Sequence, residues 1–198
     1  RTKSAYQAAL PTQLMRYLSE QLGATHECYA SPLNHTLPSY CSMFPGPDCH
    51  FGSVGNFYSW RDPAEGVYEC NPPFDNASVA MCFNKIHALL CGHRAGPLAF
   101  LVVIPKMDFD GDGARADVGK ELDLAARKLW KPFLRRRFEV QKDEHVYRMG
   151  LQHRRQEDGA HWRPTKVSQI FWFANDAGAA KYVITDDMQR EMVARFDY

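Results

Sequence analysis

The chain has 198 residues, of which 45% are hydrophobic and 24% charged, with a formal net charge of +1. This balance is typical of a globular protein with a sizeable core, and we expect a single domain over residues 1–198. No apolar run reaches the roughly 18 residues of a membrane helix, and no signal-peptide core follows the first residues. Because the chain lacks an initiator Met, we expect it to be the core of a longer protein.

The first half of the chain alternates between helical and extended patterns. Apolar residues recur at helical spacing over 10–22, and Gly23 is the expected stop. An extended run over 26–30 breaks at a Ser-Pro pair, and a short helix is expected over 33–44. After a turn and a glycine-bearing loop, residues 67–70 are expected to form a strand.

The second half continues this alternation. Residues 98–104 are continuously apolar, which fits a central strand covered on both faces. The other expected helices cover 77–90, 121–133 and 186–196. The other expected strands cover 138–140, 146–149 and 168–173. This order predicts an α/β fold with an open, mostly parallel sheet and helices on both faces, in which ligands bind beyond the carboxyl ends of the strands.

The six cysteines include no Cys-x-x-Cys pair, so we expect no zinc site. Two fall in expected strands and two in an expected helix, where buried free thiols are common, and this usage favours a reducing compartment. The series Asp108, Asp110, Asp112 imitates the start of a calcium loop, but Gly119 stands where the final Glu is required. No metal is therefore expected.

Basic residues are concentrated late in the chain. Residues 1–126 carry nine Lys and Arg against thirteen Asp and Glu, whereas residues 127–155 carry ten against three. Aromatic residues are interleaved with this basic stretch, which suits a polyanion that carries bases. Residues 135–137, three consecutive arginines, are candidates for steering RNA, and a solvated helix end is the alternative.

The block Asn71-Pro72-Pro73-Phe74 lies between an expected strand and an expected helix. This combination suits methylation of an amino group in a conjugated ring, such as N6 of adenine. The Asn71 side-chain carbonyl and the Pro72 backbone carbonyl can each accept one N–H bond, which favours a pyramidal nitrogen. Proline fixes φ and adds no competing N–H, and Phe74 can stack on the base. The alternative is a rigid turn with helix entry at Asp75.

Three blocks of the sequence together carry a family resemblance: Glu27 to Asn34, Phe51 to Ser53, and Asn71 to Phe74. They resemble the cap-specific adenosine N6-methyltransferases of the phosphorylated-CTD-interacting-factor type. Further matching blocks are Tyr40 to Ser42, Ile104-Pro105, Glu144 to Arg148 and Gln152-His153. The sequence departs from the family after the Asn-Pro-Pro-Phe block, where Asp75 is followed by Asn76 and Ala77, and after Pro105.

The resemblance implies a Rossmann-like class I S-adenosylmethionine-dependent methyltransferase with S-adenosyl-L-methionine as its cofactor. The implied substrate is the first-nucleotide adenosine at the 5′ end of capped mRNA, and the implied location is the nucleus, with the cytoplasm as an alternative. The RNA polymerase II C-terminal tail is a further implied partner, through regions outside this chain. Neither a membrane nor a metal is expected as a partner.

The resemblance and the strand-end positions together assign candidate site residues. The catalytic candidates are Asn71, Pro72, Pro73 and Phe74. The cofactor-binding candidates are Ala30, Ser31, Pro32, Leu33, Asn34, Asp48, Phe51, Gly52, Ser53 and Asn71. The substrate-binding candidates are Phe74, Asp75, Pro105, Lys106, His145, Tyr147 and Arg148.

Two other functions fit the same residues. An internal RNA or DNA adenine, or a glutamine side-chain amide, also presents a conjugated amino group, and Asn71 alone does not distinguish these acceptors. An inactive module that binds RNA or the polymerase tail is an alternative from another class, and the intact Asn71 to Phe74 block argues against it.

Overall fold

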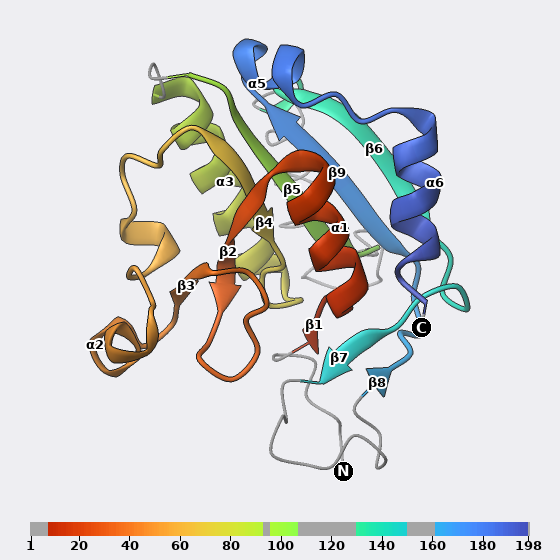
Figure 1. The fold of residues 1–198 in the computed structure, drawn as a ribbon, viewed down its shortest axis with the longest axis horizontal. Coiled ribbons are helices and arrows are strands. Elements are labelled where there is room, and N and C mark those ends of the chain that lie inside the picture. The colour runs from red at the N-terminus through yellow and green to blue at the C-terminus, as the bar shows by residue number, and fades with distance from the viewer. Residues whose placement is uncertain (1–7, 93–95, 107–129, 150–160, 198) are drawn as a thin grey trace, which may run out of the picture.

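The computed structural model describes residues 8–92, 96–106, 130–149 and 161–197 (Figure 1). The expected acidic loop over 108–119, most of the expected helix over 121–133 and the Gln152-His153 block lie outside these residues.

A six-stranded sheet in the order β3-β2-β4-β5-β9-β6 forms the centre of the described fold (Figure 1). Neighbours from β3 to β5 are parallel, whereas β9 is antiparallel to both β5 and β6. All strands except β9 therefore run in one direction, which confirms the mostly parallel sheet. The strands are β2 (Ala24–Ala30), β3 (Ser39–Ser42), β4 (Gly66–Cys70), β5 (Leu98–Pro105), β6 (Leu134–Val140) and β9 (Ser168–Ala174).

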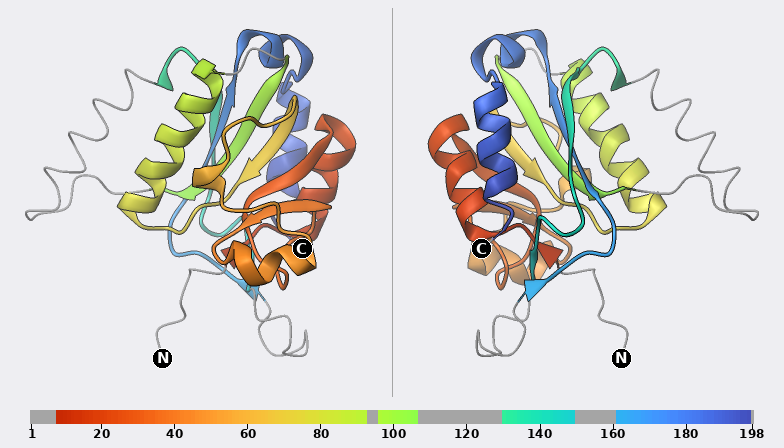
Figure 2. Two further views of the ribbon diagram at one scale, coloured as in Figure 1. Left: turned by 90° about the vertical axis from the view of Figure 1, so that its left-hand side faces the viewer. Right: turned by 90° about the vertical axis from the view of Figure 1, so that its right-hand side faces the viewer.

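Helices cover both faces of this sheet, as expected (Figure 2). Helix α1 (Thr12–Leu22) and helix α6 (Asp186–Ala194) lie on one face, and helix α3 (Asn76–Gly92) lies on the other. Helix α5 (Asp176–Lys181) and helix α2 (Pro45–Asp48) are short. Single 3₁₀ turns occupy Cys49–Phe51 and Phe57–Ser59.

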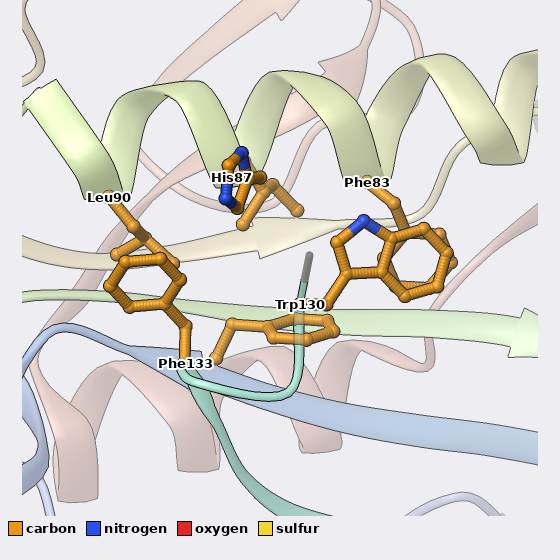
Figure 3. Close-up of a pocket in the computed structure, with 7 residues that line it drawn as sticks. Phe83, His87, Leu90, Trp130 and Phe133 are labelled. Carbon is orange, nitrogen blue, oxygen red and sulfur yellow. The ribbon is translucent and has the colours of Figure 1, made fainter. Parts of the chain in front are cut away.

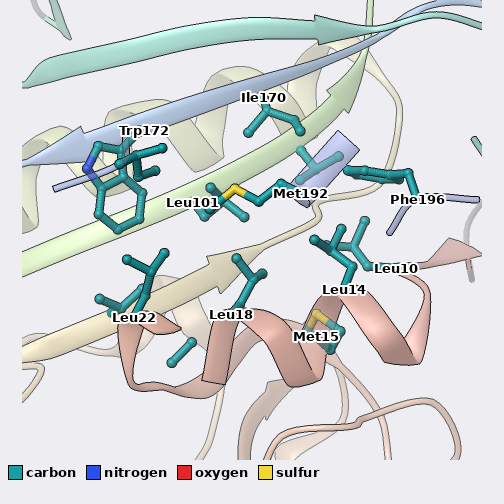
Figure 4. Close-up of a cluster of buried hydrophobic side chains, with 14 of the residues drawn as sticks. Leu10, Leu14, Met15, Leu18, Leu22, Leu101, Ile170, Trp172, Met192 and Phe196 are labelled. Atoms are coloured by element: carbon teal, nitrogen blue, oxygen red, sulfur yellow. The ribbon is translucent and has the colours of Figure 1, made fainter. Parts of the chain in front are cut away.

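Each face of β5 contributes to a separate apolar core, because every residue of this strand is buried. On the α1 and α6 face, Leu101 packs in one cluster with Leu14, Leu18 and Met192 (Figure 4). On the α3 face, the alternate β5 residues pack with Phe83 and other apolar side chains of that helix. The prediction of a central strand covered on both faces is confirmed.

Helix α1 ends where the sequence indicates. Gly23 adopts a left-handed conformation with φ of 69°, and its N–H donates to the Ser19 carbonyl at 3.0 Å. A residue without a Cβ is favoured at such a position. The buried face of the helix consists of Leu14, Met15, Leu18 and Leu22, which are all residues of the predicted pattern.

The predicted helix over 33–44 is wrong. Its apolar residues have helical spacing, but residues 39–42 form strand β3, and the short helix α2 follows it. Two features explain the difference. Pro38 lacks the N–H that a helix interior needs. In addition, the N–H groups of Thr36 and Leu37 donate to the Glu27 carboxylate at 2.5 and 2.6 Å instead of to helical carbonyls.

A second, three-stranded sheet connects distant parts of the chain. Strand β7 (Tyr147–Met149) pairs antiparallel with β1 (Ala8–Ala9) and with β8 (His161–Trp162). The strand predicted over 146–149 is thus confirmed, although it belongs to this second sheet. Among the described helices, none is long and apolar enough to cross a membrane.

Candidate active site

The carboxyl ends of β2, β4 and β5 lie at one edge of the main sheet, since these strands are parallel neighbours. Ala30 ends β2, Asn71 directly follows β4, and Pro105 ends β5. The structure therefore brings together the three segments that the sequence singles out. The strand order also reverses between β2 and β4, which is where open α/β sheets bind ligands.

Asn71 presents an unused acceptor at this edge. Its side chain is 9% exposed, and its Nδ2 donates to the Ala8 carbonyl of β1 at 2.6 Å. Only the amide nitrogen can donate to a carbonyl, so this bond fixes which way the amide points. The Oδ1 atom is buried and has no partner among the described residues. A buried acceptor without a partner is costly, so this oxygen is available to accept an N–H from a ligand.

The rest of the Asn-Pro-Pro-Phe block follows Asn71 between β4 and helix α3. Pro72 is buried, and Pro73 and Phe74 are half-buried. The Phe74 ring contacts the Tyr147 ring edge-on, with centroids 5.5 Å apart and planes at 65°. One face of a half-buried ring held in this way suits stacking on a planar base.

Asp75 caps helix α3. Its carboxylate accepts the Ser78 N–H at 2.9 Å. Burial would raise the pKa of Asp75, but hydrogen bonds from Ser78 and Ala77 outweigh it and hold the pKa below its ordinary value. Asp75 therefore acts as the first residue of the helix cap, which is the alternative that the sequence offers. Its carboxylate, predicted to bind substrate, is already engaged in this cap.

The predicted cofactor residues 30–34 lie at the end of β2 and in the loop that follows it, residues 31–37, which we call the cofactor loop. Asn34 Oδ1 accepts from the Ser31 N–H at 2.7 Å and from the Ser31 hydroxyl at 3.0 Å, which closes a tight turn. Leu33 is exposed, whereas Ala30, Ser31 and Pro32 are half-buried. The Asn34 side-chain oxygen is therefore engaged within the loop.

The other predicted cofactor residues lie beside β3. Ser53 forms a parallel bridge with Tyr40, and its hydroxyl lies 2.8 Å from the Ser42 hydroxyl. The Phe51 carbonyl accepts from the Tyr40 hydroxyl at 2.9 Å, and the Phe51 side chain is exposed. Gly52 adopts a φ of 96°, which favours glycine. Asp48 ends α2 and accepts the Ser53 N–H through its backbone carbonyl.

Two buried carboxylates that sequence reasoning missed lie on the strands that lead into the site, β2 and β4. Glu27 and Glu69 are register partners on β2 and β4 and are 5% and 2% exposed. Burial raises the pKa of Glu69 well above its ordinary value, and the neighbouring Glu27 raises it further. Glu69 Oε1 is buried without a partner among the described residues. A charged residue inside an apolar strand is the signal that could have found both.

Three predicted substrate residues differ in accessibility. His145 and Tyr147 have no exposed surface, and both hydrogen-bond the Ser168 hydroxyl at 2.7 Å. The second ring nitrogen of His145 lies 2.6 Å from the Gln141 carbonyl, and burial lowers the pKa of this histidine. Lys106, in contrast, is exposed beyond β5 and pairs with Glu139 at 3.3 Å. His145 and Tyr147 thus lie beneath the site, behind Phe74.

The basic stretch is partly engaged within the fold. Arg135 pairs with Asp176 at 2.6 Å, and Arg136 pairs with Asp186 and donates to the Ile184 carbonyl at 2.8 Å. These bonds attach α5 and the start of α6 to the edge strand β6. The two arginines are therefore structural, whereas Arg137 is exposed, with its guanidinium 5.2 Å from the centre of the Phe171 ring.

An apolar hollow lies on the α3 face, away from the strand ends (Figure 3). Leu90, His87 and Phe83 of α3 face Trp130 and Phe133 across it. The Phe83 and Trp130 rings stack with centroids 4.1 Å apart, and the hollow has no space for a water molecule. The hollow is a closely packed apolar contact between α3 and the residues around Trp130, without room for a ligand. Among the described residues, no cluster of His, Cys, Asp or Glu could hold a metal ion.

The sheet order, the single reversed strand and the strand-end site define a class I methyltransferase fold. The predicted Rossmann-like fold class is confirmed. The chain belongs to the family described as "Phosphorylated CTD interacting factor 1 WW domain", which matches residues 1–150. The described part of this match includes α1, α3 and the strands β1 to β7. The resemblance found in the sequence is thereby confirmed.

Two curated relatives are similar to this chain over most of its length. The human and mouse proteins named mRNA (2'-O-methyladenosine-N(6)-)-methyltransferase are each 30% identical to this chain over 190 residues. Each alignment covers 96% of this chain and 25% of the relative. The chain therefore spans about a quarter of the length of the curated relatives it matches.

Proposed function

We propose that this chain transfers a methyl group from S-adenosyl-L-methionine to N6 of the cap-adjacent adenosine of mRNA. The observation that carries the proposal is the buried, unpartnered Oδ1 of Asn71, which directly follows β4. The hydrogen bond from Asn71 Nδ2 to the Ala8 carbonyl of β1 orients this amide. The names of the two relatives support adenosine N6 in mRNA as the acceptor.

The proposed chemistry is mainly positioning. Asn71 Oδ1 and the Pro72 carbonyl accept the two N–H bonds of the adenine amino group, while Phe74 sets the plane of the base. The acceptors direct the nitrogen lone pair toward the methyl group, in line with the sulfur, and such alignment can supply much of a rate enhancement. A base is not required before transfer, because the nitrogen becomes acidic once it is alkylated.

The residues at this edge fit the proposed cofactor. S-adenosylmethionine supplies an activated methyl group on a positively charged sulfur, and it carries an ammonium group. Glu27 and Glu69 place two buried carboxylates beside the cofactor loop, and Glu69 retains an unpartnered oxygen. Burial raises the pKa of both groups, and a cationic ligand would favour their ionised forms.

Further partners and the location follow as parts of the proposal. Lys106, exposed beyond β5, is the substrate candidate best placed to meet an RNA phosphate. The family description names the phosphorylated C-terminal domain, which supports an association with the RNA polymerase II tail through regions outside this chain. Such an association would take place in the nucleus.

Transfer of labelled methyl groups to capped and uncapped RNA beginning with adenosine tests the proposal. We expect strong preference for the capped RNA, with the label on the first nucleotide by mass spectrometry. Equal rates would refute the cap requirement, and labelling of an internal adenine or of a glutamine amide would establish an alternative acceptor. Absence of S-adenosylmethionine binding in calorimetry would favour an inactive binding module.

Asn71→Ala tests the catalytic role directly. We expect transfer to be lost while cofactor affinity stays within about threefold, because the removed acceptor faces the base. Asn84→Ala is the matched control, since Asn84 is an exposed asparagine of the neighbouring helix α3. Full turnover by the Asn71 variant would defeat the assigned role.

A further inference from the structure

Arg148 reaches across the site from strand β7 to the cofactor loop. Its Nη2 donates to the Asn34 backbone carbonyl at 3.1 Å and to the Thr36 hydroxyl at 2.9 Å. These partners precede it by more than a hundred residues in sequence. Arg148 is half-buried, so its guanidinium is directed into the fold, whereas the sequence alone assigns it to the RNA substrate.

Glu27 holds the same loop through its backbone. Its Oε1 accepts the N–H groups of Thr36 and Leu37 at 2.5 and 2.6 Å. Thr36 is thus fixed by its backbone to a carboxylate on β2 and by its side chain to a guanidinium on β7. Hydrogen bonds to charged groups are stronger than neutral ones, and this stretch of loop has few backbone bonds of its own.

We infer that Arg148 is a positioning residue that holds the cofactor loop against β7. The inference rests on the proposed function, because residues 31–34 of this loop are assigned to the cofactor and the role of the rest of the loop follows from that assignment. The Asn34 side chain is engaged within the turn, so Arg148 binds this residue through its backbone carbonyl. This hydrogen bond fixes the position of the loop relative to β7. Loss of the guanidinium frees the loop and weakens cofactor binding. The affinity for RNA changes much less, because Arg148 does not contact the RNA in this assignment.

The test compares Arg148→Met with Arg163→Met. Arg163 is an exposed arginine near β8 that bonds Asp143 and Asp197, so its loss removes the same charge without touching the loop. Calorimetry measures the Kd for S-adenosylmethionine, and methyl transfer at saturating cofactor measures the KM for capped RNA. We expect Arg148→Met to raise the cofactor Kd roughly ten- to a hundredfold and to leave the RNA KM within about twofold. The control should change the cofactor Kd by less than about twofold.

Two further variants keep the inference testable if Arg148→Met fails to fold. Thr36→Val removes one acceptor and should raise the cofactor Kd less than Arg148→Met does. Arg148→Lys retains the charge but loses the planar fork, and should rescue affinity only in part. Amide hydrogen exchange without ligand should be faster over residues 31–37 in each variant and unchanged in α3.

The possible failures are distinct. An unchanged cofactor Kd with a raised RNA KM would overturn the inference and return Arg148 to the substrate. Unchanged hydrogen exchange over residues 31–37 would overturn it as well. If the unmodified protein bound no S-adenosylmethionine, the proposed function itself would fall, and the exchange measurement would still judge whether Arg148 holds the loop.

Discussion

His26 makes the stability of the β2–β3 pair depend on pH. Its ring nitrogens lie 2.8 Å from the Ser39 hydroxyl and 3.3 Å from the Cys41 sulfur, and the ring packs 4.7 Å from Trp60. Burial lowers the pKa of His26 from 6.5 to about 4. A neutral ring is therefore required in the folded state, while the unfolded chain takes up a proton near pH 6.5.

The sign and size of the effect follow from this difference. The stabilisation by neutral His26 is complete above pH 6.5 and is lost as the pH falls toward 4, because the unfolded state then binds more protons. Each tenfold change in proton affinity is worth about 1.4 kcal/mol, so the loss amounts to roughly 3 kcal/mol.

Urea unfolding from pH 7.5 to 4.5 measures this loss in the unmodified protein and in His26→Gln. We expect the difference in unfolding free energy between the two to shrink by about 2.5 kcal/mol over this range, because the range ends just above the folded-state pKa. Buried carboxylates such as Glu69 act in the opposite direction, and the comparison cancels their contribution because both proteins carry them. Parallel stability curves for the two proteins would refute the reasoning, since they would mean that His26 does not titrate on unfolding.

Two further substitutions test packing and the support of the site. Gly178→Ala would place a Cβ 2.4 Å from the Leu98 carbonyl and should destabilise the fold by about 1–3 kcal/mol in thermal or urea unfolding, whereas Gly92→Ala meets no atom within 4 Å and should be neutral or stabilising. Equal effects of the two would contradict the close approach of α5 to β5. Ser168→Ala removes the hydroxyl that hydrogen-bonds both His145 and Tyr147, and it should lower the free energy of unfolding in urea by about 2–4 kcal/mol. An unchanged unfolding midpoint would contradict this network.

Local patterns predict the parts of the fold that depend on neighbouring residues. The helical spacing before Gly23 and the apolar run of β5 each determine an element, because burial of one face or of both faces imposes the pattern. The position of Asn71 at a strand end follows from the same reasoning, since it requires only a strand followed by a helix.

The features that were missed depend on partners distant in sequence. The helical spacing over 33–44 is overridden by the Glu27 carboxylate, which takes the N–H groups that a helix would use. The reversed direction of β9 follows from its place between β5 and β6, which a single apolar run does not reveal. The family resemblance assigns His145 to the substrate, yet Ser168 and the Gln141 carbonyl satisfy its ring and permit complete burial.

Strand β1 links the proposed chemistry to the amino-terminal end of the described chain. The carbonyl of Ala8 orients the Asn71 amide, although the two residues are 63 positions apart. A backbone group cannot be altered by side-chain substitution, so the geometry of the acceptor tolerates sequence change at Ala8 provided that the β1–β7 pairing persists. Shortening the chain near β1, or fusing another segment there, should therefore reduce the rate of methyl transfer more than the stability of the fold. The reason is that β1 contributes only two residues to its sheet but orients the side-chain amide of Asn71.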